Sequence, residues 1–283
     1  MSLSSANAHW QSDTAGQVKP NVSIIVPVFN EGPQLEPFLK HLRERAALAE
    51  LILVNADGAQ CLSESISKLC DRVLTSRRGR AAQMNLGAAV ANGDVLWFVH
   101  ADCEVPRESL EKITNALQDR QVVGGCFRIR FPRRELIYRA SNAVGNLVVE
   151  LFGGGYGDRG IFCRHKDFFA VGGYPDVPLF EDAEFYGRLR QRGRTRQLSS
   201  YVVTSARRHE KIGPNRLTAA YWLLSLLYVL RVPISLLVRI YNRLCLSGDE
   251  RTGPSHSVVG RRQGTIRLAH NCGRCARYQF AGF

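Results

Sequence analysis

The sequence predicts an α/β fold in which a mostly parallel central sheet carries helices on both faces and is followed by amphipathic or apolar C-terminal helices. Two observations predict this fold. From residue 21 onward, short apolar runs alternate with helical stretches, which is the pattern of repeated βα units. Later, residues 217–238 form an apolar and aromatic stretch that Arg231 and Pro233 interrupt, which predicts a helix or a pair of helices.

The composition restricts the class of protein. With 283 residues and 45% hydrophobic residues, the chain can bury one sizeable core, which excludes a long disordered protein. A formal net charge of +13 favours acidic partners such as phosphorylated substrates, anionic lipid headgroups or nucleic acid. Eight cysteines spread through an ordinary α/β chain predict reduced thiols, and therefore a cytoplasmic protein, rather than a disulfide scaffold.

The alternation gives the order of the elements. We expect strands at residues 22–28, 51–55, 73–75 and 95–99, with helices near 34–48 and 62–69 and an Ala-rich helix before the fourth strand. A helix near 107–119 and a strand at 122–131 follow. The regularity then breaks into a helix near 134–151, a glycine-rich turn at 153–157 and a short strand at 160–164. We therefore expect the second half to be irregular and to face the substrate.

Four regions are expected along the chain. They are a disordered leader (1–20), a nucleotide-binding domain (21–215), an apolar-basic helical segment (216–248) and a flexible basic tail (249–283). In the helical segment, arginines flank Trp222 and the tyrosines, which fits helices lying in a membrane interface, and packing on the domain or a second subunit is the alternative. The tail carries a single Cys272-Gly-Arg-Cys275 pair, which does not complete a zinc site.

Polar residues follow the strands of the predicted parallel sheet. Asn30 and Glu31 end the first strand in Pro27-Val-Phe-Asn-Glu31, Asp57 follows the second in Asn55-Ala-Asp-Gly58, and Asp102 follows the fourth. Ligands bind at the carboxyl edge of such sheets, so these side chains are expected to face a nucleotide or a metal. For Asp57 an ordinary Asx turn is the alternative interpretation.

A basic run precedes the Ala-rich helix. Arg77-Arg-Gly-Arg80 lies before a helix whose amino-terminal N–H groups favour anions, which predicts a diphosphate site. Gln83 and Asn85 are polar residues inside this helix, and surface exposure explains them as well as ligand contact does.

The second half supplies candidates for chemistry. Glu181 and Asp182 precede an Arg-rich helix, where a carboxylate either caps the helix or acts as the general base for an acceptor hydroxyl. The segment Tyr156-Gly-Asp158 has the polar and aromatic composition of an acceptor site. His209 offers an imidazole that could bind a metal, although a single histidine is more often structural.

Together these motifs resemble the family 2 glycosyltransferases of the GT-A fold. The resemblance covers residues 21–243 and is carried by Val22-Ser-Ile-Ile-Val-Pro-Val-Phe-Asn-Glu31, Gly79-Arg-Ala-Ala-Gln-Met-Asn-Leu-Gly87, Gly93-Asp-Val-Leu-Trp-Phe-Val-His-Ala-Asp102 and Glu181-Asp182. Within the family, the chain looks most like the subgroup associated with radical-SAM and selenocysteine-linked gene clusters.

The resemblance implies inverting transfer of a sugar from a UDP- or GDP-linked donor, with Mn²⁺ or Mg²⁺ on the diphosphate. It implies roles for individual residues: Pro27, Asn30, Glu31, Asp57, Arg80, Gln83, Asn85 and Asp102 for the nucleotide-sugar, Asp102 for the metal, Asp182 with Glu181 for catalysis, and Tyr156, Gly157 and Asp158 for the acceptor. His100 stands where the family has the first acid of its metal motif, and it or His209 is a candidate ligand, since imidazole suits Mn²⁺ better than Mg²⁺. Asn55-Ala-Asp-Gly58 also departs from the family pattern, which bears on the register of Asp57.

Two other functions compete. A nucleotidyltransferase would need a glycine-rich phosphate loop where Pro27-Val-Phe-Asn30 stands. A non-catalytic basic protein that binds a membrane or nucleic acid would explain the charge, but nucleic acid is the less favoured partner. The apolar segment instead favours a lipid-linked or otherwise hydrophobic acceptor at the inner membrane surface, and protein and small-molecule acceptors are the alternatives. The enzyme is expected in the cytoplasm or peripheral on the membrane.

Overall fold

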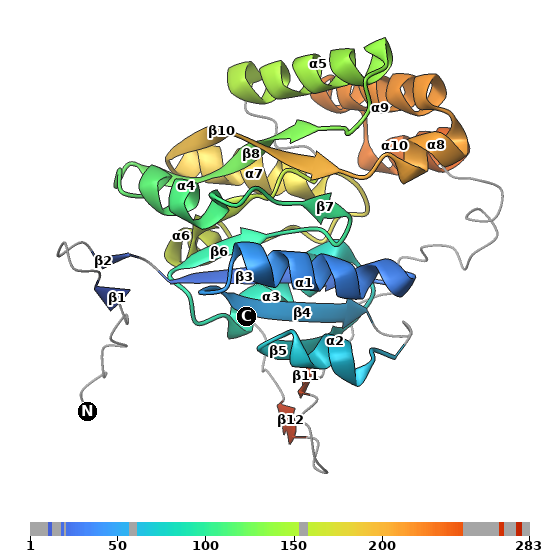
Figure 1. Ribbon diagram of the computed structural model, residues 1–283. Coiled ribbons are helices and arrows are strands. Elements are labelled where there is room, and N and C mark those ends of the chain that lie inside the picture. Colours follow the sequence, from blue (N-terminus) through green and yellow to red (C-terminus); the bar gives the residue numbers. More distant parts are fainter. Residues whose placement is uncertain are drawn as a thin grey trace.

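The computed structural model describes residues 11–12, 18–19, 21–56, 61–152, 158–245, 266–268 and 276–278 (Figure 1). Asp57, Tyr156, Gly157 and the Cys272/Cys275 pair lie outside the described residues, as do most of the predicted leader and tail. The predictions for these residues therefore stay predictions.

The described strands form a ten-stranded sheet in the order β12-β11-β5-β4-β3-β6-β9-β8-β10-β7, and a separate short pair. The bounds are β1 Gln11–Ser12, β2 Val18–Lys19, β3 Val22–Val28, β4 Glu50–Ala56, β5 Arg72–Ser76, β6 Val95–Phe98, β7 Cys103–Glu104, β8 Val122–Arg130, β9 Phe162–Arg164, β10 Arg194–Thr204, β11 Ile266–Leu268 and β12 Ala276–Tyr278. β3 pairs in parallel with β4 and β6, β4 with β5, and β8 with β10. β9 runs antiparallel between β6 and β8.

Helices cover both faces of the sheet. Their bounds are η1 Gly32–Gln34, α1 Leu35–Arg45, α2 Glu64–Lys68, α3 Arg80–Val90, α4 Ser109–Ala116, α5 Leu136–Phe152, α6 His165–Ala170, α7 Glu181–Arg192, α8 Arg207–Ile212, α9 Pro214–Val229 and α10 Ile234–Leu244. Alternate residues of β3 enter different cores: Ile24 packs with Leu39 of α1, whereas Ile25 packs with Met84 of α3. The predicted fold class is confirmed.

Strand β10 was not predicted from the sequence. It begins with the polar residues Arg194-Thr-Arg-Gln, and most of its first half is exposed or half-buried. Its neighbour on the outer side, β7, pairs at the far end through Val203 and Thr204. The first half of β10 therefore lacks the apolar alternation that identifies a strand in a sequence.

The apolar C-terminal segment forms two helices. α9 and α10 bury Leu217, Ala220, Leu224 and Leu237 in a small core of their own, and they gather with α5 and α8 at one end of the molecule (Figure 1). The break at residues 230–233 matches the predicted interruption. No helix among the described residues has both the length and the apolar character that crossing a bilayer requires.

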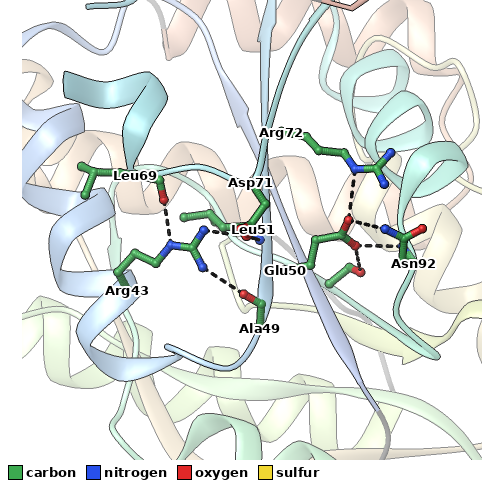
Figure 2. Close-up of polar contacts among 9 residues, drawn as sticks. Arg43, Ala49, Glu50, Leu51, Leu69, Asp71, Arg72 and Asn92 are labelled. Atoms are coloured by element: carbon green, nitrogen blue, oxygen red, sulfur yellow. Dashed lines mark hydrogen bonds and ion pairs between the residues drawn. The ribbon is translucent and has the colours of Figure 1, made fainter. Parts of the chain in front are cut away.

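The amino-terminal end of β4 is held by polar contacts that range from half-buried to exposed (Figure 2). The Glu50 carboxylate accepts from the Asn92 backbone N and Nδ2, both at 2.8 Å, accepts from Ser23 Oγ at 2.5 Å and pairs with Arg72 Nε at 3.1 Å. These contacts tie together the amino-terminal ends of β3, β4 and β5 and the segment that precedes β6. They fix the register of the strands whose other ends carry the site.

On the other side of β4, the Arg43 guanidinium bridges α1 and two loops (Figure 2). It donates to the Leu69 carbonyl at 2.7 Å and to the Ala49 carbonyl at 3.0 Å, and it pairs with Asp71 at 2.5 Å. Asp71 in turn accepts from the Leu51 backbone N at 2.7 Å. A charged group with several partners in one geometry stabilises more than an isolated surface pair.

We predict that Glu50→Gln lowers the free energy of unfolding by about 1–3 kcal/mol, because an amide NH₂ would then face groups that are themselves donors. The matched control is Glu64→Gln, which removes the exposed Glu64–Lys68 pair and should cost about 0.5 kcal/mol or less. Urea unfolding of both variants measures the difference. Equal losses would contradict the structural role given to Glu50.

Candidate functional site

Four carboxylates from three parts of the chain converge at the carboxyl edge of β3 and β6. Asp102 follows β6, Asp158 precedes the antiparallel strand β9, and Glu181 and Asp182 open α7. All four lie close enough to Arg80, the first residue of α3, to raise the pKa of its guanidinium, against an opposing loss of hydration. Arg80 Nη1 is 3.9 Å from Glu181 Oε1. The site is therefore an acidic cluster with one central cation.

Arg80 is placed there by the close approach of α3 to the sheet. A Cβ added at Gly87 would lie 2.5 Å from Ile25 Cγ2, so the glycine permits the contact between α3 and β3. Gly79 precedes the helix with φ of 127°, a conformation that glycine adopts readily. The predicted diphosphate site therefore consists of a left-handed turn, a helix amino terminus and Arg80.

His100 lies buried between two of the acids. Its Nδ1 is 3.6 Å from Asp158 Oδ1, and its Nε2 is 4.0 Å from Asp182 Oδ2. Burial lowers the pKa of His100 to about 4, with a further contribution from the Arg80 charge, although Asp158 opposes the shift. The imidazole is therefore neutral near pH 7, and it separates the two carboxylates without supplying a compensating charge.

Asp102, Cys103 and Asp158 form the group of side chains that could hold a metal ion. Their ligand atoms all lie within 4.8 Å of one another. Among the described residues, neither His100 nor His209 belongs to this group. Burial and the Asp158 charge raise the pKa of Asp102 to about 6, against the opposing charge of Arg80. Burial opposes ionisation of Asp158, but His100, Arg80, the Thr204 hydroxyl and Arg208 lower its pKa overall.

The donor set of this group suits a hard cation through its oxygens. Carboxylate oxygens are the usual ligands of Mg²⁺ and Mn²⁺, whereas thiolates select softer metals. Burial and the adjacent carboxylates raise the pKa of the Cys103 thiol well above its ordinary value, so it remains protonated. Its Sγ is 3.7 Å from Asp102 Oδ1 and 3.6 Å from the Asp158 carbonyl oxygen. The two aspartates are therefore the residues that fit a divalent ion.

Asp182 is the most deeply buried of the acids. Burial, the adjacent Glu181 charge and Asp158 raise its pKa well above the ordinary aspartate value, while Arg80 and Tyr174 oppose the shift. The residue before the pair, Phe180, adopts a left-handed conformation with φ of 65°. A carboxylate with a raised pKa is a stronger base than an exposed aspartate, which suits proton abstraction.

The turn after β3 lines the same edge of the sheet. Pro27 is buried within β3, and Asn30 has a left-handed φ of 54°. Burial raises the pKa of Glu31, while Arg207 and Arg80 oppose the shift. Arg78 lies 4.1 Å above the ring of Phe29. The predicted residues Asn30, Glu31 and Arg80 thus come together from two separate segments.

Gln83 and Asn85 are engaged with the backbone. Gln83 is buried, and its Nε2 donates to the carbonyls of Val28 at 2.8 Å and Val54 at 2.7 Å. Asn85 donates from Nδ2 to the Tyr174 carbonyl at 2.8 Å and accepts from the Tyr174 N–H at 2.9 Å. The surface explanation therefore fails for Gln83, whose amide joins the carboxyl ends of β3 and β4.

His209 packs among aromatic rings. On α8 it is buried, with ring centroids 4.7 Å from Phe131, 5.6 Å from Tyr138 and 5.9 Å from Tyr221. Burial lowers its pKa, and the Arg208 charge adds to the effect. These contacts give the imidazole a structural role in the layer that joins α5, α8 and α9.

Two features of the site were not found from the sequence. Cys103 was not considered, and Asp158 was assigned to the acceptor rather than to a group with Asp102. The missing signal is the antiparallel direction of β9, which brings the residues before it to the edge where β6 ends. A backbone bond from Ser205 N to the Asp102 carbonyl, 3.1 Å long, likewise joins the end of β10 to this edge.

Comparison with known proteins identifies the relatives of this arrangement. The model of the family described as Glycosyl transferase family 2 matches residues 23–174, more than half of the chain. No curated protein sequence matches the chain significantly.

Solved structures share the fold at low sequence identity. A mannosyltransferase from Pyrobaculum calidifontis in complex with GDP-Man and Mn²⁺ has a TM-score of 0.58 at 20% identity, over 76% of this chain and 65% of that one. Glucosyl-3-phosphoglycerate synthase from Mycobacterium tuberculosis, in complex with Mn²⁺, UDP and glucosyl-3-phosphoglycerate, has a TM-score of 0.51 at 14% identity, over 92% of this chain and 87% of that one. The TarS fragment 1–349 from S. aureus, in complex with UDP-GlcNAc, has a TM-score of 0.51 at 14% identity, over 65% of this chain and 58% of that one.

This chain thus spans less than two thirds of the mannosyltransferase and of the TarS fragment. The likeness to these structures establishes the fold, and the expected GT-A-like architecture is confirmed.

We predict that Gln83→Met lowers the free energy of unfolding by about 1–3 kcal/mol, because two strand carbonyls lose their buried donor. Gln197→Met is the matched control, since the Gln197 amide nitrogen and oxygen are buried without a partner among the described residues. Replacing that amide should be neutral or stabilising. Thermal unfolding of the two variants checks the difference. An equal loss of unfolding free energy in both would show that the two Gln83 hydrogen bonds do not stabilise the fold.

Proposed function

Because this chain belongs to glycosyl transferase family 2 and is therefore a glycosyltransferase, we propose that it moves a sugar from a UDP- or GDP-linked donor to an acceptor hydroxyl with inversion. The observation that carries the proposal is the convergence of Asp102, Asp158 and Asp182 beside Arg80. Family membership sets aside both a nucleotidyltransferase and a non-catalytic basic protein.

The donor site is proposed at the edge formed by the turn after β3 and the start of α3. Pro27, Asn30 and Glu31 would line the nucleotide pocket, with Asp57 on the base or ribose. The α3 amino terminus and Arg80 would hold the diphosphate, because backbone N–H groups and a guanidinium both stabilise phosphate oxygens. Gln83 and Asn85 support this wall through their backbone hydrogen bonds.

A divalent cation is proposed between the donor and the acids. Asp102 and Asp158 would hold it, and when bound it neutralises charge on the leaving diphosphate. Mn²⁺ is the ion in two of the related structures, and it is the first to test here. Arg80 would add a fixed positive charge on the same side, where charge develops during displacement.

Asp182 is proposed as the general base. It is buried, its pKa is raised, and it lies at the start of α7 beside Glu181. An acceptor hydroxyl within hydrogen-bond reach would lose its proton to Asp182 as the oxygen attacks the sugar carbon. Burial of Asp182 beside the Glu181 charge thus provides the basicity that an exposed aspartate lacks.

The acceptor is proposed to carry an apolar, lipid-linked portion, with Tyr156 and Gly157 near its hydroxyl. The apolar helices α9 and α10 support this class of acceptor, and we place the enzyme in the cytoplasm at the inner membrane surface. The motif His100-Ala-Asp102 also supports the narrower kinship with the subgroup associated with radical-SAM and selenocysteine-linked gene clusters.

We predict that Asp182→Asn reduces sugar transfer about 10²–10⁴-fold while donor affinity stays within a few-fold, because an amide cannot accept the acceptor proton. Transfer is measured by release of nucleoside diphosphate, after a thermal-shift screen of UDP- and GDP-sugars with Mn²⁺ has identified a donor. Asp176→Asn is the control, since Asp176 is an exposed acid paired with Arg77. Transfer by Asp182→Asn at the wild-type rate would remove Asp182 as the base.

We also predict that excess chelator abolishes transfer and that added Mn²⁺ restores it. Asp102→Asn and Asp158→Asn should each raise the Mn²⁺ concentration needed for half-maximal transfer, because each removes one carboxylate ligand. Glu108→Gln, a largely exposed acid outside the group, should leave that concentration unchanged. Full activity in chelator would assign Asp102 and Asp158 a role other than metal binding.

A further inference from the structure

The exposed face of α9 is apolar. Trp222, Leu223, Leu226, Val229 and Leu230 are exposed by 43%, 43%, 56%, 66% and 65% respectively. Their spacing of three to four residues puts them along one side of the helix, opposite the residues that pack into the C-terminal core. A continuous exposed stripe of this kind marks an interaction surface.

The charges around this stripe are of one sign. Residues 214–244 include four arginines and no aspartate or glutamate, and all four arginines are exposed: Arg216, Arg231, Arg239 and Arg243. Arg216 and Arg231 stand at the two ends of the stripe. Apolar side chains flanked by cations, with tryptophan among them, match the layers of an anionic lipid surface, where acyl chains lie beneath phosphate groups.

The turn after α9 presents Arg231 in a strained conformation. Its φ is 59°, and the bonds Val232 N to Leu227 O at 3.0 Å and Arg231 N to Tyr228 O at 2.9 Å close the helix as a Schellman motif. Glycine is the usual residue at this left-handed position. An arginine there is conformationally unfavourable, which points to a role for its guanidinium beside Leu230.

The same turn contacts the helix that carries the proposed base. Tyr228 donates to Glu184 Oε1 at 2.6 Å, and its ring stacks on Phe180 with centroids 4.4 Å apart. A cavity of about 510 Å³ lies between Glu184 and the α9–α10 turn, with Arg231 and Ile234 in its wall. Glu184 lies three residues after Glu181 on α7, so the cavity borders the helix whose first turn carries the proposed base.

We propose that α9 and the α9–α10 turn bind an anionic membrane surface, inserting the stripe among the acyl chains and pairing the arginines with headgroup phosphates. This rests on the proposed function, because a lipid-linked acceptor would then reach the site along the cavity between α7 and the turn. The surface is the entry side of the acceptor, and Tyr228 joins it to α7.

The apolar part is tested by co-sedimentation of the full chain with phosphatidylcholine vesicles, with and without phosphatidylglycerol. The wild type is expected to bind the anionic vesicles, and Leu226→Ser combined with Leu230→Ser to weaken binding at least about tenfold, because two inserted leucines are lost. Leu48→Ser is the control, because Leu48 is 88% exposed and lies far from α9 in the sequence. This variant should bind the vesicles as the wild type does. Wild-type binding by the double variant would overturn the proposal.

The charged part is tested with Arg231→Gly, which relieves the left-handed strain and so should keep or raise the unfolding temperature. Its affinity for anionic vesicles is expected to fall about fivefold, and added salt should weaken wild-type binding. Arg120→Ala removes an arginine from another basic surface, the cavity near Lys166 and Arg194, and should have little effect. Equal losses in both variants would show that net charge, not this surface, drives binding, and would overturn the proposal.

Donor binding without vesicles separates this inference from the proposed function. If the wild type binds a nucleotide-sugar in the thermal-shift assay but ignores anionic vesicles, the membrane surface is wrong and the glycosyltransferase proposal stands. If it binds vesicles but no donor, the donor proposal fails instead. Size-exclusion chromatography with light scattering measures the oligomeric state. If the wild type is a dimer that does not bind vesicles, and the double leucine variant is a monomer, the stripe binds a second copy of the chain and the proposal is overturned.

Discussion

The site depends on one electrostatic constraint, the gathering of acids around Arg80. Asp102, Asp158, Glu181 and Asp182 come from segments far apart in the sequence, and their mutual repulsion at close range must be offset. Arg80 offsets it in part, while the neutral His100 separates Asp158 from Asp182. Burial and the remaining repulsion between the carboxylates raise the pKa values of Asp102 and Asp182. A bound cation would relieve this excess of negative charge, which is why the same cluster suits a metal and a proton acceptor.

Much of the fold and part of the site could be predicted from the sequence. The apolar run of β3 and the small residues of α3 are local signals, so the edge that carries Glu31, Arg80 and Asp102 was predicted. β10 was missed because its first four residues are all polar, so no apolar alternation marks the start of the strand. The grouping of Asp158 with Asp102 depends on the direction of β9, and no local pattern encodes strand direction. Burial of Gln83 likewise depends on packing between segments.

The C-terminal helices contact the helix that carries the proposed base. Phe180 and Glu184 of the α7 region contact Tyr228 of α9, so the element with the proposed base rests against the apolar layer. His209 and its aromatic neighbours fill the space between α8, α5 and α9. Under the proposed function, an acceptor that approaches from this layer would meet Asp182 at the start of α7. Displacement with inversion would then require the acceptor oxygen and the diphosphate to lie on opposite faces of the sugar carbon.

The central claim is that the acids around Arg80 form the donor site of a sugar transferase. A crystal structure of the chain with Mn²⁺ and the nucleotide-sugar that binds best tests it most directly. We expect the diphosphate between the α3 amino terminus and Arg80, the metal on the Asp102 and Asp158 carboxylates, and the sugar facing Asp182. A donor bound elsewhere, for instance in the basic cavity beside Arg120 and Arg194, with the acid cluster left free, would contradict the account.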